Sequence, residues 1–339
     1  MRLYPFVRWS LLALVVMGLT SCSRSNKPTV AFISNNAEEF WTIARHGAER
    51  AAAEEDVNLA FRMPADGSAS EQRAIIEDLL VKGVKGIAIS VKNPKDQAEF
   101  LRSVAAQVPL LTQDNDLAAE DTSIRRCYIG TNNYEAGRAA GELVKKAIPN
   151  GGKVRIFVGS RDDLNAIERQ QGVLDVLAGM KDAPGEPVVD GRRYGPYHVL
   201  PTMTDDSKAE KCRANVDDTL VKHPDIACLV GLWEYNPPAM LLSVEAHKKQ
   251  GQIALVAFDE NEETLRGIKE GSIIGTVVQD PYKFGYESVK ILAALARGDE
   301  SVLRRDDMDE QKRIFIPHRV ITKDNVEQFH AELNQLKGK

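Results

Sequence analysis

Short apolar segments alternate with longer amphipathic segments along most of the chain. Thr29–Ser34 is apolar and β-branched, which predicts a buried strand, and the helical spacing of apolar positions from Phe40 to Glu55 predicts a helix. Further strands are predicted at Val57–Arg62, Gly86–Ser90 and Leu110–Asp114, and further helices at Ser70–Lys82 and Asp96–Gln107. This order of elements is typical of a parallel sheet built from strand–helix–strand units.

The same alternation repeats in the second half of the chain. Strands are predicted at Lys153–Val158, Val188–Tyr194, Ala227–Leu232, Leu255–Phe258 and Ile273–Val278, and helices at Ala166–Leu177, Lys208–His223 and Ala239–Lys249. A chain of 339 residues also exceeds the size at which one hydrophobic core usually stops growing. The sequence therefore predicts an α/β protein with two doubly wound parallel-sheet lobes.

Polar and aromatic residues follow most of the predicted strands. Open parallel sheets bind ligands at the carboxyl ends of their strands, so these residues are candidates for a binding site. They are Asn36, Phe40, Trp41, Asp114, Asn115, Asn165, Arg169, Tyr235, Asn236, Asp259 and Gln279. Each type also has a structural explanation: an Asp can cap a helix, an Arg can be solvated, and an aromatic ring can belong to the core.

The chemistry of this set suits a carbohydrate. Asp accepts hydrogen bonds, Arg donates them, and Asn and Gln do both, which matches hydroxyl groups that donate and accept. The flat rings of Trp41 and Phe40 can cover the apolar face of a sugar. The set predicts a site for a small polar ligand.

The first 22 residues differ from the rest. Arg2 and Arg8 accompany an apolar run, Ser10–Gly18, that is too short to span a bilayer, which predicts a secretory signal peptide. The segment Leu19-Thr20-Ser21-Cys22 resembles the lipobox of bacterial lipoproteins, which implies that Cys22 becomes a lipid-modified first residue anchored to a membrane. The alternative is an ordinary signal peptide in which Cys22 is incidental. Residues 23–28 are predicted to form a polar tether.

Charge and cysteine content limit which partners, disulfides and metal sites are expected. A net charge of −5 gives no reason to expect a nucleic-acid partner. Cys212 and Cys228 could form a disulfide in an oxidising compartment, or they could be small buried side chains like Cys127. The cysteines lack CxxC spacing and the histidines are scattered, so neither a metal site nor a cofactor is predicted.

Several motifs resemble those of a known family, the periplasmic sugar-binding proteins of ABC transporters of the ribose-, galactose- and xylose-binding type. The resemblance extends from about Thr29 to Val320. Its motifs are NNAEEFWTIARHGAERAA (35–52), VPLLTQDND (108–116), YIGTNNYEAGRAAGELV (128–144), NAIERQQGV (165–173) and the segment 255–289 with its late Asp, hinge Gln and aromatic-Gly pair.

The resemblance implies a type I periplasmic binding protein with a three-segment hinge. It implies an N-terminal lobe of residues 29–130 plus 281–312, and a C-terminal lobe of residues 131–280 plus 313–339. The implied ligand contacts are Asn36, Phe40, Trp41, Asp114, Arg169, Asp259 and Gln279, with either Tyr235 or Asn236. Two extra residues separate Asn36 from the aromatics, a departure from the family pattern that concerns the transfer of Asn36. Asn115 stands where ribose binders usually have Arg, and Trp233 and Tyr235 make that strand end bulkier, so the resemblance favours a pentose, hexose or related polyol and disfavours ribose itself.

The same resemblance implies the biological setting. The expected protein is a monomer in the periplasm or cell envelope that closes its hinge on a sugar and presents it to an ABC permease. An alternative is a sensory subunit that presents its closed form to a membrane receptor. An enzyme is not expected, because the sequence shows no nucleophile elbow, no metal-ligand spacing and no Gly-rich phosphate loop. A repressor of the lactose type would carry a helix-turn-helix where the signal peptide stands.

Overall fold

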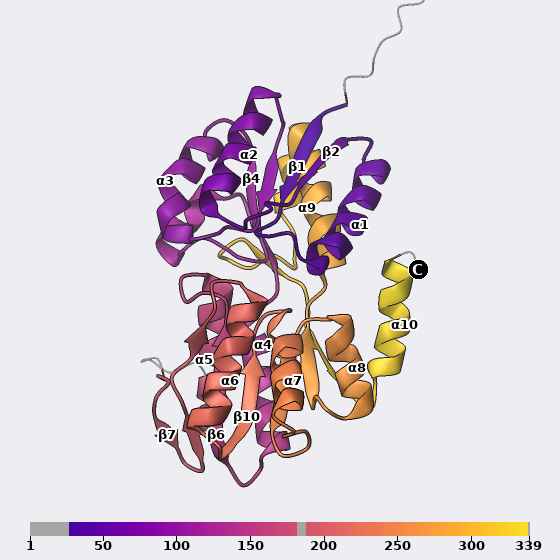
Figure 1. Ribbon diagram of the computed structural model, residues 1–339. Helices are drawn as coiled ribbons and strands as arrows, with labels where there is room; N and C mark the ends of the chain where they lie inside the picture. Colours follow the sequence, from indigo (N-terminus) through magenta and orange to yellow (C-terminus); the bar gives the residue numbers. More distant parts are fainter. Residues whose placement is uncertain (1–26, 182–187, 338–339) are drawn as a thin grey trace, which may run out of the picture.

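A computed structural model describes residues 27–181 and 188–337 of the chain. The predicted signal peptide, Cys22 and the first four residues of the tether lie outside the described residues. Within the described ranges, every helix is too short or too polar to cross a membrane. The two predicted α/β lobes are present, one above the other in Figure 1.

The first lobe is built on a parallel sheet with the strand order β13-β5-β4-β3-β1-β2. Its strands are β1 (Thr29–Ile33), β2 (Asn58–Arg62), β3 (Ile87–Ile89), β4 (Leu110–Gln113), β5 (Tyr128–Gly130) and β13 (Arg313–Phe315). Helices α1 (Glu39–Glu54) and α9 (Pro281–Ala296) share one apolar cluster with the sheet. Helices α2 (Ala69–Val81) and α3 (Pro94–Ala105) share the other cluster, so helices cover both faces. Short 3-10 turns, η1 (Ala119–Ile124) and η2 (Glu300–Leu303), complete this lobe.

The second lobe has the same central design with extra strands at its edges. The strand order is β14-β12-β11-β10-β6-β8-β7, and β9 also pairs with β6. The strands are β6 (Gly152–Val158), β7 (Arg193–Tyr194), β8 (Tyr197–Val199), β9 (Met203–Thr204), β10 (Ile226–Gly231), β11 (Ala254–Phe258), β12 (Gly275–Val278) and β14 (Arg319–Thr322). The helices are α4 (Asn133–Ala147), α5 (Leu164–Leu177), α6 (Ala209–Lys222), α7 (Asn236–Ala246), α8 (Glu262–Glu270) and α10 (Val326–Leu336). The outermost pairs, β12–β14 and β7–β8, are antiparallel.

The strand order places a binding crevice in each lobe. In both sheets the order of five central strands is equivalent: β2-β1-β3-β4-β5 in the first, and β8-β6-β10-β11-β12 in the second. The direction of winding reverses between β1 and β3, and again between β6 and β10, and a doubly wound sheet opens a crevice at such a point. The loops that follow these strands lie where the two lobes meet in Figure 1.

Local sequence signals fix the boundaries of several helices. Ser68 caps α2 by accepting a hydrogen bond from the Glu71 amide. Asp280 caps α9, and Pro281 follows as its first residue, a position where a missing N–H costs nothing. Gly271 ends α8 in the left-handed conformation that favours glycine. These signals fix the starts of α2 and α9 and the end of α8.

The chain crosses between the lobes three times, and the third crossing differs from the expectation. The first two crossings follow β5 and β12. The third was expected at about Arg313, but β13 (Arg313–Phe315) pairs with β5 in the first sheet, and β14 joins the second sheet. The crossing therefore lies between Phe315 and Arg319, because the strand that starts at Arg313 completes the first sheet before the chain leaves it.

The prediction of a strand at Val188–Tyr194 is largely wrong. Only Arg193 and Tyr194 form a strand, and β8, which begins at Tyr197, is the parallel neighbour of β6. Gly191 and Gly195 have positive φ values of 75° and 54°, so the backbone turns at both positions. Val189 is also exposed, which shows that this apolar residue does not mark a buried strand.

The three described cysteines are buried and unpaired, so the hypothetical disulfide between Cys212 and Cys228 is not formed. Burial raises the pKa of the Cys127 and Cys212 thiols to about 12 and raises that of Cys228 further. These cysteines are therefore neutral thiols in the core, which was the alternative interpretation.

Candidate functional site

A cleft between the two lobes gathers most of the residues that the sequence singled out. It holds about 420 Å³ of space not occupied by atoms, counting the part open to solvent, which is within the usual size range of ligand sites. Its lining consists of Asn35, Asn36, Glu38, Phe40, Trp41, Asp114, Asn165, Arg169, Trp233, Glu234, Tyr235, Asp259 and Gln279. Residues up to Asp114 come from the first lobe, and the rest come from the second lobe or the second crossing.

Each lobe presents one buried aspartate at the end of a strand, and the two have the same backbone conformation. Asp114 follows β4 with a φ of 58°, and Asp259 follows β11 with a φ of 64°. Such left-handed positions are uncommon for residues other than Gly, and Asn and Asp tolerate them best. Backbone strain of this kind concentrates at functional sites. The conformation turns each carboxylate away from its sheet and into the cleft.

Hydrogen bonds hold both carboxylates in place. The Ser90 hydroxyl donates to Asp114 Oδ2 at 2.7 Å, and the Asn35 amide donates to the same oxygen at 3.4 Å. The Gln279 amide donates to Asp259 Oδ1 at 2.9 Å. Burial raises the pKa of Asp114 to about 6, with Arg169 opposing the rise, and burial likewise raises the pKa of Asp259.

Among the residues that the structure describes, Arg169 is the one cation that lines the cleft, and its guanidinium is buried and oriented. Its Nε donates to Asn133 Oδ1 at 2.9 Å, and its Nη1 donates to the Leu232 carbonyl at 2.9 Å. The guanidinium lies over the Phe258 ring, 4.3 Å from the ring centroid, and Nη1 is 3.9 Å from Asp259 Oδ2. Nη2 is buried without a hydrogen-bond partner among the described residues. The arginine is thus held by the protein with one donor left for a ligand.

Close helix packing supports the position of Arg169. A side chain at Gly137 of α4 would come within 2.2 Å of the Arg169 carbonyl oxygen, and one at Gly172 of α5 would come within 2.2 Å of the Tyr134 carbonyl oxygen. The two helices therefore touch backbone to backbone, which only glycine permits. This contact fixes the first turns of α5, from which Arg169 projects.

Aromatic rings from both lobes line the cleft. Trp41 and Phe40 start α1, with centroids 4.9 Å apart in an edge-to-face contact, and both also belong to the core of the first lobe. The Trp41 indole N–H donates to Asn35 Oδ1 at 3.2 Å. Trp233 and Tyr235 follow β10 in the second lobe and also meet edge to face, with centroids 6.3 Å apart. The rings give the cleft apolar walls on two sides.

Two predicted residues do not line the cleft. Asn115 is buried beneath it, where its amide donates to the Val91 carbonyl and its Oδ1 accepts from the Asn165 amide at 3.1 Å. Asn236 is fully buried, with its Oδ1 accepting from the Trp233 amide at 3.0 Å and its amide donating to Asp205 at 3.0 Å. The side chains of both residues are already engaged in hydrogen bonds within the protein, so these residues support the site from beneath. Of the two alternatives at this strand end, Tyr235 lines the cleft.

Four cleft residues were not predicted: Asn35, Glu38, Trp233 and Glu234. Asn35 is the direct neighbour of Asn36, and Trp233 and Glu234 directly precede Tyr235, so the strand ends were identified but not every residue facing the cleft. Glu38 is followed by Glu39, and such an acidic pair is typical of the solvated start of any helix, so the sequence does not mark Glu38 as a cleft residue.

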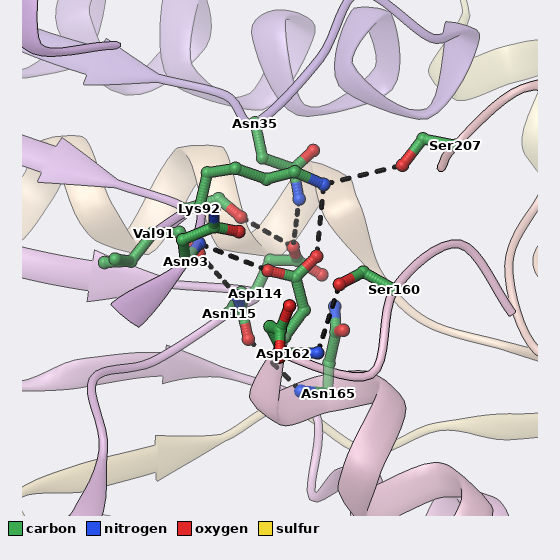
Figure 2. A network of polar contacts seen from close by, with 12 residues as sticks. Asn35, Val91, Lys92, Asn93, Asp114, Asn115, Ser160, Asp162, Asn165 and Ser207 are labelled. Atoms are coloured by element: carbon green, nitrogen blue, oxygen red, sulfur yellow. Dashed lines mark hydrogen bonds and ion pairs between the residues drawn. The ribbon is translucent and has the colours of Figure 1, made fainter. Parts of the chain in front are cut away.

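Polar contacts join the lobes beside the cleft (Figure 2). Lys92, which follows β3, forms an ion pair of 3.1 Å with Asp163 at the start of α5, and the Asn93 amide donates to the same carboxylate at 3.3 Å. The bond from the Asn165 amide to Asn115 Oδ1 also crosses from one lobe to the other. The lobes therefore contact each other directly at this edge of the cleft.

The described residues contain no cluster of three or more His, Cys, Asp or Glu side chains arranged to hold a metal ion. The cleft chemistry consists of amides, carboxylates, one guanidinium and aromatic rings.

Comparison with known proteins agrees with this geometry. The family profile described as "Periplasmic binding protein domain" matches residues 30–300. The ribose import binding protein RbsB of Salmonella typhimurium is 23% identical over 295 residues, covering 85% of this chain and 91% of that protein. The D-ribose/D-allose-binding protein of Pseudomonas aeruginosa is 25% identical, covering 84% and 91%.

A solved structure shows the same relationship. The crystal structure of an ABC transporter solute binding protein from Burkholderia graminis, in complex with D-arabinose, is 31% identical with a TM-score of 0.77. The alignment covers 88% of this chain and 96% of that one. The profile match spans most of the chain, and the fold, the interleaved lobes and the cleft between them agree with it. The chain belongs to the periplasmic binding protein family.

Proposed function

We propose that this protein captures a monosaccharide or related polyol in the cleft between its lobes and presents it to an ABC permease when the lobes close. The family match and the names of the relatives support capture and import. The relatives named above are described as ribose and D-ribose/D-allose binders or as an arabinose complex, which favours import of a sugar over the sensory alternative.

One observation carries the proposal. Five buried polar atoms that lack a hydrogen-bond partner among the described residues belong to side chains lining the same cleft: Asn165 Oδ1, Arg169 Nη2, Trp233 Nε1, Glu234 Oε2 and Gln279 Oε1. A buried polar group without a partner costs about 1–3 kcal/mol, so such groups rarely gather without a function. They comprise donors and acceptors, which is the combination that sugar hydroxyls satisfy.

Closure of the lobes provides the mechanism. Asp114 and the aromatics of α1 lie on the first lobe, and Arg169 and Asp259 lie on the second. A ligand that contacts both groups stabilises the closed arrangement, because those contacts form together only when the lobes meet. A permease that recognises the closed arrangement would then receive only loaded protein. The proposal assigns binding and not chemical conversion of the sugar.

A thermal-shift screen of the protein against monosaccharides and polyols tests the proposal. A ligand at 100 times its dissociation constant stabilises the folded state by about 2.7 kcal/mol, which raises the melting temperature measurably. The Arg169→Lys variant should lose most of the shift, because lysine lacks the planar fork. Arg138→Lys, at an arginine whose guanidinium bonds to Tyr134 and the Met180 carbonyl and does not line the cleft, is the matched control and should keep it. A panel without any shift would contradict sugar capture.

We also propose that Cys22 anchors the protein to a membrane through a lipid, with residues 1–22 removed as a signal peptide and the following residues acting as a tether. This places the protein in the periplasm or cell envelope, in keeping with its family. The Cys22→Ala variant should leave the membrane fraction, whereas Cys127→Ala should remain there. A Cys22→Ala protein that still sediments with membranes would refute the anchor.

A further inference from the structure

The cleft has an unusual charge balance for a site that binds a neutral sugar. Four carboxylates line it, from Glu38, Asp114, Glu234 and Asp259, against the single guanidinium of Arg169. Asp114 accepts hydrogen bonds from Ser90 and Asn35. Asp259 accepts one from Gln279 and lies opposite Arg169. The carboxylates of Glu38 and Glu234 form no ion pair with any described residue. The excess of negative charge is thus concentrated on these two glutamates.

Glu234 is the more informative of the two. It is 8% exposed, and its Oε1 accepts a hydrogen bond from the Asn261 amide at 3.1 Å. The residue lines the cleft, and its Oε2 is buried without a hydrogen-bond partner within the described chain. A buried carboxylate oxygen that faces a ligand site without a donor is poised to accept a hydrogen bond from that ligand.

The groups around Glu234 make a cation the best partner. Burial raises the pKa of Glu234, and the nearby carboxylates of Glu38, Asp259 and Glu39 raise it further. Two lysines of this region are engaged elsewhere: Lys337 pairs with Glu39 and Glu262, and Lys92, which lies over the Trp233 ring, pairs with Asp163. A ligand that brings its own positive charge would offset repulsion that the protein leaves uncompensated.

The aromatic walls suit the same ligand. Trp233 immediately precedes Glu234, and Lys92 Nζ already lies over the Trp233 ring at 5.2 Å from a ring centroid. Indole rings attract ammonium groups through their negative faces. An ammonium group bound at Glu234 would lie beside Trp233 and opposite Glu38, which comes from the other lobe.

We propose that the physiological ligand is a monosaccharide bearing a protonated amino group, and that Glu234 and Glu38 bind its ammonium while Arg169, Asp114 and Asp259 bind hydroxyls. This inference rests on the proposed function and specifies its ligand class. The ammonium joins Glu38 of the first lobe to Glu234 of the second, so its charge also contributes to lobe closure.

Calorimetric titration with matched sugars tests the inference. Glucosamine, galactosamine and mannosamine are each compared with their neutral parent hexose and with their N-acetyl derivative, which has the nitrogen but no charge. At least one amino sugar should bind roughly 10- to 100-fold more tightly than both of its partners, the range expected for a hydrogen bond to a charged group. A neutral or N-acetyl sugar that binds as tightly would overturn this inference and leave sugar capture standing. Silence across all of them would overturn this inference, and sugar capture itself would be overturned only if the wider screen of monosaccharides and polyols were silent as well.

A charge-neutral variant tests whether Glu234 causes the preference for an amino sugar. Glu234→Gln keeps the side-chain shape and the acceptor for Asn261, so it should fold normally and bring the amino sugar down to the affinity of its neutral parent. Glu270→Gln, an exposed glutamate at the end of α8, is the matched control and should keep the full preference. If Glu234→Gln retains the preference while melting like the parent protein, Glu234 does not bind the ammonium.

Discussion

Individual residues of the cleft show how the site is kept ready for a ligand at a cost to stability. Asp114 is almost fully buried, has a left-handed backbone and has a pKa raised to about 6. Each of these features disfavours the folded, ligand-free protein. They are tolerated because Ser90, Asn35 and the opposing Arg169 fix the carboxylate where a ligand can use it.

The raised pKa of Asp114 predicts a pH dependence of stability. Its carboxyl binds a proton more readily in the folded state than in the unfolded state, whose pKa is near 3.8. Between these values the folded state holds more protons, so the free energy of unfolding falls as pH rises. Asp114→Asn removes this effect and should gain roughly 2 kcal/mol relative to the parent protein between about pH 4 and pH 6.

Thermal melting of the ligand-free protein across this pH range measures the difference. Histidines with lowered pKa values, such as His223 and His318, act in the opposite direction, but they are common to both proteins and cancel. Asp324→Asn, an exposed aspartate, should follow the parent curve. Parallel curves for Asp114→Asn and the parent protein would show that Asp114 is not held in a costly ionised state.

At the scale of elements, strand ends decide which residues reach the cleft. Strand ends were predictable because apolar runs stop there, and Asp114, Asp259 and Arg169 were identified in this way. The orientation of each neighbouring residue was not predictable, since it depends on local hydrogen bonds. Asn115 and Asn236 turn inward to bind backbone amides, whereas Trp233 and Glu234 turn toward the cleft. Hydrophobic periodicity carries no information about these side-chain orientations.

The loop after β6 makes a specific packing prediction. A Cβ atom at Gly159 would lie 1.9 Å from Cζ3 of Trp233, so the indole rests directly on the glycine backbone. Gly159→Ala should displace the ring, destabilise the fold by about 1–3 kcal/mol and weaken sugar binding. Adding Trp233→Phe removes the clashing ring atoms and should restore the melting temperature. Melting and titration of the single and double variants measure both effects, and a Gly159→Ala protein with unchanged affinity would contradict this support for Trp233.

At the scale of the whole molecule, the lobes interleave through three crossings and meet at the cleft. The two-lobe α/β fold was predictable from the repeated strand–helix pattern and from the family resemblance. The third crossing was misplaced, because nothing in the sequence near Arg313 shows which sheet a three-residue strand joins. Such pairing is decided by long-range contacts, here between β13 and β5. Helix α10 then packs along the second lobe, and its end reaches α1 through the ion pair between Lys337 and Glu39 (Figure 1).

The ion pair between Lys92 and Asp163 predicts how the lobes respond to mutation. It is well buried and joins the two lobes, so removing it should favour the open arrangement. Lys92→Met should increase the radius of gyration of the ligand-free protein in X-ray scattering and weaken ligand binding several-fold, because a smaller fraction is ready to bind. Lys95→Met, an exposed lysine on α3, should change neither. Equal scattering for Lys92→Met and the parent protein would show that this pair does not hold the lobes together.

Tryptophan fluorescence tests the central claim most directly, because two of the three tryptophans of the chain, Trp41 and Trp233, line the cleft. The protein is titrated with neutral and amino monosaccharides while its emission is recorded. The account predicts a saturable change with at least one sugar, lost or strongly weakened in Arg169→Lys and preserved in Arg138→Lys. No saturable change with any sugar, or an identical titration for Arg169→Lys, would contradict capture of a sugar in this cleft.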